Sequence, residues 1–326
     1  MNRHQTYQLL SQLFTHGLTE EDFKVVRQID ALAKHLPDSF DPDEAAADHQ
    51  HLFGFNVFPY ECVFLDPSGQ LGGDITTSAI RDYRQIGFDV GSAVGSPDHI
   101  SHELALLAFL DQTETKAHEE NHPAQVALMQ DYQRSFFDKH ILRWMPPLVL
   151  AIRDQFHPFY GALATVTLET LVAHRTILGG TPIANFSLPE PPELLEDEKT
   201  GLKEIVAFLL TPAFSGIYLG RDDIGRLARD HSIPRGFGER RQMLASLLRS
   251  AANYGDMGQV LSSLQALVTT WEIAYQEMAT SLEPIVTAAT WKKRVSTTAG
   301  MITHMRSRLQ NVGQDAPSFP DNEATL

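Results

Sequence analysis

The sequence contains one cysteine, Cys62, and so lacks both an internal disulfide framework and any multi-cysteine zinc or iron–sulfur site. No apolar run approaches the roughly 18 residues that a membrane span requires. The N-terminal residues 1–5, MNRHQ, lack the apolar stretch of a secretory signal. Together these absences predict a cytoplasmic protein with no integral membrane segment.

Positive charge is also scarce. The chain has 26 Lys and Arg residues against 41 Asp and Glu residues, which gives a formal net charge of −15. This balance argues against nucleic-acid binding, because that binding depends on cationic contacts to phosphate. An acidic surface suits a basic partner, although net charge can also serve only to keep protein molecules apart.

The sequence has no convincing run of alternating β-branched residues. Helical periodicity dominates instead, and the only strand-like piece is residues 62–65. Pro146 and Pro147 are expected to stop or kink the helix that precedes them. The pattern therefore predicts an all-α fold. Apolar or aromatic residues recur at helical spacing in three stripes: Leu128, Tyr132, Phe136, His140 and Trp144; Met243, Leu244, Leu247, Leu248 and Ala251; and Leu261, Leu264, Leu267, Val268 and Trp271.

Proline and acidic residues interrupt the helical pattern near the middle of the chain. Residues 189–198 read PEPPELLEDE, a composition that cannot build a core and favours a linker. We therefore predict a helical domain over residues 1–180, a linker over 181–200 and a second helical module over 201–326. The net charge is −12 for residues 1–188, −5 for 189–198 and +2 for the remainder.

The segment at residues 95–104, GSPDHISHEL, has the pattern of a helix start. Ser96 suits the N-cap, Pro97 the first helical position, and Asp98 the first turn near the positive end of the dipole. This structural role accounts for Asp98. His99 beside it is expected at the mouth of the helix, where an exposed imidazole can contact a ligand.

A metal site is an alternative interpretation of the same segment. His99, His102 and Glu103 have the spacing H-x-x-H-E and not the H-E-x-x-H that puts two ligands on one helical face. No group of three ligands emerges with the usual geometry, so we expect no metal and no cofactor. A metal-dependent helical hydrolase is the least favoured alternative function.

Two further segments are rich in aromatic residues. Residues 53–66 are expected to form a long loop whose aromatic side chains either pack against the core or form an exposed binding surface. The glycines that follow form no phosphate-binding pattern. In the second segment, residues 136–147, His140 and Trp144 lie one turn apart and are expected in a core seam.

Taken in order, these segments resemble the TorD/DmsD/NarJ family of molybdoenzyme maturation chaperones. The family's proline-acid-histidine helix start is similar to PDHISHEL at residues 97–104. Its loop motif is similar to PYECVFL at residues 59–65, with Cys62 where serine is usual. Its H-x-x-x-W-x-P pattern is similar to HILRWMP at residues 140–146. The resemblance covers roughly residues 1–180.

The resemblance implies a TorD-like helical bundle that is not an enzyme and can form a homodimer. It implies a partner, the apo-form of a molybdopterin oxidoreductase subunit or its twin-arginine signal peptide, held until cofactor insertion is complete. A basic-then-apolar peptide needs carboxylates beside an apolar surface, which an acidic module can supply. The resemblance implies partner binding by Tyr60, Phe64, Leu65, Pro97, Asp98, His99 and Glu103, and structural roles for His140, Trp144 and Pro146.

The second module lies outside the resemblance, and its role is unknown. Its arginines either form a solvated helix face or face the acidic first module or a second partner. An alternative function is therefore a helical scaffold or regulatory protein that binds a partner through this module. The arginines in question are Arg221, Arg226, Arg229, Arg235, Arg240 and Arg241.

Overall fold

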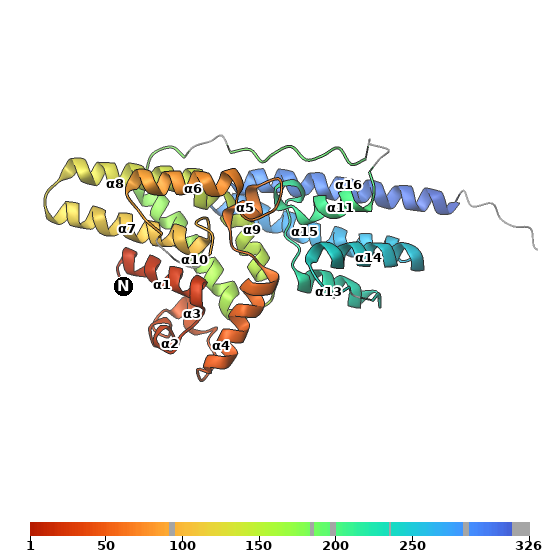
Figure 1. Cartoon of the computed structure of the whole chain (residues 1–326), viewed down its shortest axis with the longest axis horizontal. Coiled ribbons are helices and arrows are strands. Elements are labelled where there is room, and N and C mark those ends of the chain that lie inside the picture. Colours follow the sequence, from red (N-terminus) through yellow and green to blue (C-terminus); the bar gives the residue numbers. More distant parts are fainter. Residues whose placement is uncertain (91–94, 183–185, 196–199, 235, 283–286, 315–326) are drawn as a thin grey trace, which may run out of the picture.

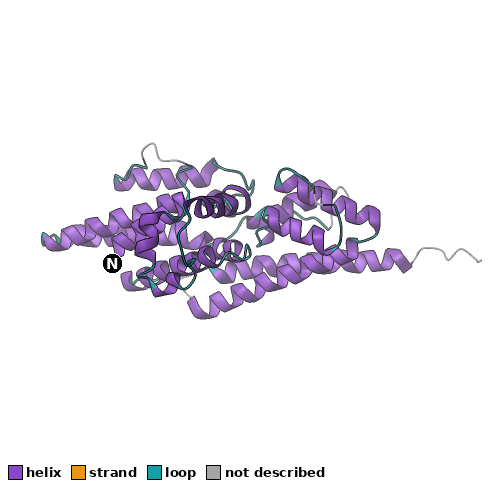
Figure 2. Cartoon of the chain, turned by 90° about the horizontal axis from the view of Figure 1, so that it is seen from below, coloured by secondary structure: helices purple, strands orange, loops and turns teal. Residues whose placement is uncertain are grey.

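Helices form almost all of the regular structure in the computed structural model, which describes residues 1–90, 95–182, 186–195, 200–234, 236–282 and 287–314. Within these residues there is no strand, as Figure 2 shows, and the one isolated β-bridge pairs Tyr60 with His99. The predicted all-α fold is confirmed. None of the described helices combines the length and apolar character needed to cross a membrane.

The N-terminal module contains the long helix α7, which has a neighbouring helix on two sides. The helix α7 lies along α1 on one side and along α8 on the other, and α9 packs against α10 (Figure 1). Its elements are α1 (Arg3–His16), α2 (Glu20–Val26), α3 (Asp30–Ala33), α4 (Pro42–His49), the π-helix η1 (Gln50–Asn56), α5 (Glu61–Leu65), α6 (Gly73–Ile86), α7 (Ile100–Glu119), α8 (Pro123–Phe136), the π-helix η2 (Phe137–Ile141), α9 (Leu142–Arg153) and α10 (Pro158–Leu178).

The C-terminal module is built on a long helical hairpin, α15 with α16, which extends along the molecule in Figure 1. The two apolar stripes predicted here are buried on α14 and α15, except that Leu267 is only partly buried. Its elements are α11 (Leu202–Leu210), α12 (Pro212–Ser215), α13 (Arg221–Asp230), α14 (Arg240–Tyr254), α15 (Met257–Leu282) and α16 (Ala288–Gln314).

Three local predictions in the N-terminal module are wrong. Residues 62–65 are not strand-like but belong to α5, and the expected aromatic loop is largely helical because η1 and α5 occupy most of it. The stripe from Leu128 to Trp144 does not lie on one helix, because η2 separates α8 from α9 and Leu128 is 46% exposed. The extra residue in each π-turn rotates the face that follows, which four-residue spacing does not reveal.

Pro146 and Pro147 do not stop the helix, contrary to expectation; α9 runs through both of them. They lie in its second turn, directly after the wide π-turn of η2, so the chain can accept their rings there. Neither proline has a backbone N–H. The carbonyl groups of Leu142 and Arg143, four residues earlier, therefore lose their normal α-helical donors.

Helix α16 supplies the missing donors. The Thr287 hydroxyl donates to the carbonyl oxygens of Leu142 at 3.0 Å and Arg143 at 3.3 Å. The indole N–H of Trp291 donates to the same Arg143 oxygen at 2.7 Å, and Trp291 is fully buried. The two prolines thus create the polar contacts on which the C-terminal module docks.

Other contacts extend this interface. The Trp271 indole donates to the Asp154 carboxylate at 2.6 Å, and the Tyr218 hydroxyl donates to the Asn56 carbonyl at 2.9 Å. The predicted linker also packs on the protein, since Arg294 donates to the Pro189 carbonyl at 2.7 Å. Its described residues carry no helix and follow one edge of the molecule in Figure 1. Buried side chains of both modules form one continuous core.

This interface makes a stability prediction. Replacing Trp291 with Phe keeps an aromatic ring but removes the shorter of the two hydrogen bonds to the Arg143 carbonyl, which should lower the free energy of unfolding by about 1–3 kcal/mol. Urea unfolding of the full chain measures this. Pro147→Ala restores an N–H opposite the same carbonyl, so Trp291→Phe should cost less in the Pro147→Ala background than in the parent.

Lys293→Ala, at an exposed position of the same helix, is the matched control and should change stability by less than about 0.5 kcal/mol. Equal costs of Trp291→Phe in both backgrounds would mean that the proline-freed carbonyl does not hold α16 in place.

Candidate functional site

The three segments that carry the resemblance meet inside the N-terminal module. The first two join through their backbones: the Ile100 N–H donates to the Pro59 carbonyl at 3.0 Å, and the Glu61 N–H donates to the Asp98 carbonyl at 2.9 Å. This short antiparallel clip holds the start of α5 against the start of α7. Residues far apart in sequence thereby share one location.

The Asp98 side chain strengthens the clip. Its carboxylate accepts from the Cys62 N–H at 2.9 Å and from the Ser96 hydroxyl, and Asp98 is 0% exposed. The charge of Asp98 adds to burial in raising the pKa of the Cys62 thiol to about 12, so this thiol stays protonated at neutral pH. Asp98 therefore fixes the start of α5 through a charge-assisted hydrogen bond to the Cys62 N–H.

The helix start itself differs from the prediction. The helix α7 begins at Ile100, three residues after Pro97, and its N-cap is His99 and not Ser96. The His99 imidazole accepts from the Ser101 N–H at 3.2 Å, which requires a neutral ring nitrogen. Burial, helped by His102, lowers the pKa of His99 to about 3 and keeps the ring neutral.

The third segment reaches the same place through His140. Its Nδ1 lies 2.9 Å from Glu61 Oε2, and its Nε2 lies 3.1 Å from Asp82 Oδ2. Burial alone would lower the pKa of His140, but the Glu61 charge and the hydrogen bonds to both carboxylates outweigh it and raise the pKa to about 9. The ring is therefore an imidazolium between two carboxylates at neutral pH.

Trp144, one turn further, binds the remaining carboxyl group. Its indole N–H donates to Glu103 Oε2 at 3.2 Å, and its ring lies 5.6 Å from the Phe64 ring, centroid to centroid. Burial, together with the charges of Glu61 and Asp98, raises the pKa of Glu103 well above its usual range. Glu103 is therefore harder to ionise than an exposed carboxyl group. We call this set the motif junction: Glu61, Asp82, Asp98, Glu103, His140 and Trp144.

Most residues that were expected to contact a partner are buried. Tyr60 and Pro97 are partly exposed. Phe64, Leu65, Asp98, His99 and Glu103 are buried, with exposures of 9% or less. Asp98 and His99 therefore do not lie at the mouth of an open groove, because the clip and α7 cover them. Partner binding by these seven residues stays a prediction, whereas the expected burial of His140, Trp144 and Pro146 is observed.

The junction is not arranged as a metal centre. Among the described residues, no group of three or more His, Cys, Asp or Glu side chains has an arrangement that could hold a metal ion. The Nδ1 atom of His99 lies 2.6 Å from the Ser101 hydroxyl. The junction's acids and imidazoles are used for internal hydrogen bonds.

An open pocket of about 280 Å³ lies elsewhere on the N-terminal module, and we call it the acid-edged pocket. Its apolar part includes Leu36, Phe40 and Tyr160. Asp41, Glu44 and Asp48 lie along its edge, at the start of α4 and within it. Sequence reasoning missed this site.

The sequence feature that could have indicated this pocket is the spacing of its three acids, Asp41, Glu44 and Asp48. Positions three and seven residues after Asp41 fall on the same helical face. Asp48 contacts the His157 ring at 3.0 Å, and Asp41 caps α4 by accepting from the Glu44 N–H at 3.2 Å. The Glu44 carboxylate has no hydrogen bond or ion pair within the described part of the chain.

A comparison with known protein families matches the part of the chain that contains the three motif segments. Residues 5–149 match the model of the family described as nitrate reductase delta subunit. This part of the chain is similar to that family. The NarJ/TorD-like resemblance drawn from the three motifs is therefore confirmed, with the C-terminal helical module as an addition. The family consists of molybdoenzyme maturation chaperones, which are assembly factors and not enzymes. No curated protein matches the chain.

Two buried histidines, His140 in the motif junction and His174 outside it, should have opposite protonation states. At pH 7.5 the His140 ring should give the NMR shifts of an imidazolium. The His174 ring should be neutral, because burial and then Arg3 lower its pKa to about 3. Since the pKa of His140 is raised above its usual value of about 6.5, its contribution to stability is complete below that pH and disappears as pH rises through about 9.

Asp82→Asn removes one of the two carboxylates that face His140 and leaves the other in place. The pKa of His140 should then fall, and the loss of stability should begin at lower pH. A neutral His140 ring at pH 7.5 in the parent chain would contradict the proposed charge arrangement.

Proposed function

We propose that this chain is a cytoplasmic, non-enzymatic chaperone that holds the N-terminal region or twin-arginine signal peptide of an apo molybdopterin oxidoreductase subunit during cofactor insertion and assembly. The family assignment supports the maturation role. The chemistry of the acid-edged pocket supports the choice of ligand.

The observation that carries the proposal is the pairing of carboxylates with an apolar floor. A twin-arginine peptide presents guanidinium groups followed by an apolar stretch. Carboxylates at the edge of the pocket can accept from the guanidinium groups, while Leu36, Phe40 and Tyr160 offer apolar contact area. The net charge of −12 over residues 1–188 attracts the same peptide at longer range.

We propose two roles for the residues that the family resemblance implicates. Tyr60 and Pro97 are partly exposed and contact the partner directly. The others act as positioning residues, since they hold the α5 and α7 starts in place from inside; these are Phe64, Leu65, Asp98, His99 and Glu103.

Glu44→Gln tests the pocket. It removes an exposed carboxylate without changing the size of the side chain, and should raise the Kd of a synthetic Arg-Arg-then-apolar peptide about fivefold, or about 1 kcal/mol. Added salt should weaken binding to the parent more than to the variant. Calorimetric titration of the full chain measures both effects.

Glu21→Gln, at an exposed position of α2, is the matched control, because it changes the net charge equally away from the pocket. Equal effects of the two variants would assign binding to general attraction by the acidic module. No detectable peptide binding to the parent would overturn the proposed function itself.

Asp98→Asn tests the positioning role. The variant loses charge-assisted hydrogen bonds to buried groups, so its free energy of unfolding should fall by about 1–3 kcal/mol. Any loss of peptide affinity in this variant should come only from altered geometry. The salt dependence of that affinity should therefore stay as in the parent, and a reduced salt dependence would show that Asp98 meets the peptide directly.

A further inference from the structure

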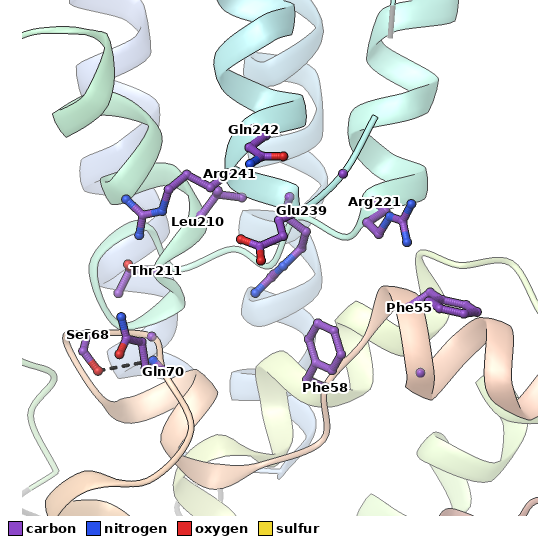
Figure 3. A pocket seen from close by; sticks show the side chains of 14 residues that line it. Phe55, Phe58, Ser68, Gln70, Leu210, Thr211, Arg221, Glu239, Arg241 and Gln242 are labelled. Atoms are coloured by element: carbon purple, nitrogen blue, oxygen red, sulfur yellow. Dashed lines mark hydrogen bonds between the residues drawn. The ribbon is translucent and has the colours of Figure 1, made fainter. Parts of the chain in front are cut away.

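A large hollow lies between the two modules. It has a volume of about 690 Å³, within the range of ligand-binding clefts. One wall comes from the N-terminal module and includes Phe58 and Ser68. The other comes from the C-terminal module and includes Arg221, Arg240 and Arg241 (Figure 3). Neither module forms this hollow alone.

The charge of the hollow is opposite to that of the chain. Three arginines line it against a single acid, Glu239, although the net charge of the protein is −15. No ion pair involves any of these three arginines within the described residues. The hollow therefore concentrates unneutralised positive charge in an acidic protein. The Arg235 side chain, from the same predicted set, lies outside the described residues.

Arg240 is held in position before any ligand binds. Its Nη1 donates to the Leu219 carbonyl at 3.1 Å. Its guanidinium carbon lies 4.6 Å from the centre of the Tyr218 ring and 5.6 Å from that of Phe58. Arg221 lies similarly over the Phe55 ring at 5.7 Å. Fixed cations lose less conformational freedom on binding, so the site is preorganised.

The cations are spread along the hollow and do not converge on one point. In Figure 3, Arg241 and Arg221 lie on opposite sides of Glu239. A second hollow of about 370 Å³ shares Phe55 and Arg221 with the first and adds Phe237, which is 84% exposed. Its one acid, Asp222, faces the His51 ring at 2.8 Å. The two hollows adjoin at the shared residues, and together we call them the inter-module groove.

We propose that the inter-module groove binds an extended acidic peptide segment of a partner protein. Its carboxylates pair with Arg221, Arg240 and Arg241, and an apolar side chain packs against Phe237. Guanidinium groups bind carboxylates through two parallel hydrogen bonds, and separated guanidiniums suit carboxylates spaced along a chain. This function goes beyond the proposed signal-peptide binding, because it uses another surface and a ligand of opposite charge.

The location also gives the C-terminal module a role. All three arginines lie after residue 149, where the family match ends. The module thus adds a basic site to an acidic chaperone domain. A partner with separate basic and acidic segments can then be held at two places on one chain.

The test uses fluorescence anisotropy of the full chain with a labelled ten-residue peptide that contains four Glu residues, one Leu and no basic residue. The double variant Arg221→Gln, Arg241→Gln should raise the Kd at least about tenfold, because it removes two charge-assisted contacts. Arg240 is left unchanged, since it also packs between the modules. Arg229→Gln with Arg249→Gln, both exposed in the same module, is the matched control and should change the Kd less than twofold.

Circular dichroism checks that the variants fold. If the double variant does not fold, the single variant Arg241→Glu, at an exposed position, replaces it. The proposal would be overturned if the groove variant and the control variant lost the same affinity. It would also be overturned if a peptide with Gln in place of Glu bound equally well, or if the parent chain did not bind the acidic peptide. Displacement by inorganic pyrophosphate at a concentration below the peptide Kd would also overturn it, in favour of a small-anion site. The Glu44→Gln variant should bind the acidic peptide as the parent does, so this test fails or succeeds independently of the signal-peptide proposal.

Discussion

The backbone of α9 around its two prolines connects the main parts of this protein. On one side, His140 and Trp144 reach the motif junction and bind Glu61, Asp82 and Glu103. On the other, the Leu142 and Arg143 carbonyls accept donors from α16. Both connections follow from the rule that buried polar groups need partners. The proline pair thus determines where the C-terminal module can dock, and that docking creates the inter-module groove.

The motif junction shows how several acids can be buried together. A carboxylate in a dry interior is stable only when a cation or hydrogen bonds compensate it. His140 supplies the positive charge for Glu61 and Asp82, Asp98 accepts from backbone and hydroxyl donors, and burial raises the pKa of Glu103 well above its usual range. These residues hold the starts of α5 and α7 together.

The surface divides into regions of opposite charge. The acid-edged pocket lies on the N-terminal module, and the arginine-lined groove lies at the border with the C-terminal module. Arginines that would be solvated on an isolated helix bundle are brought against Phe55 and Phe58 by the packing of the modules. Two surfaces of opposite charge on one chain can bind segments of opposite charge.

The sequence by itself determined the all-α class, the helical stripes of α14 and α15, and the family of the N-terminal module, because periodicity and short motifs are local properties. It did not reveal the π-turns or the continuation of α9 through Pro146 and Pro147, since both depend on partners distant in sequence. It also placed Asp98 and His99 at a surface, because a helix start is usually exposed and only the clip to residues 59–62 buries this one. The acid-edged pocket and the inter-module groove were decided by tertiary structure alone, since their walls come from segments that meet only when the helices pack.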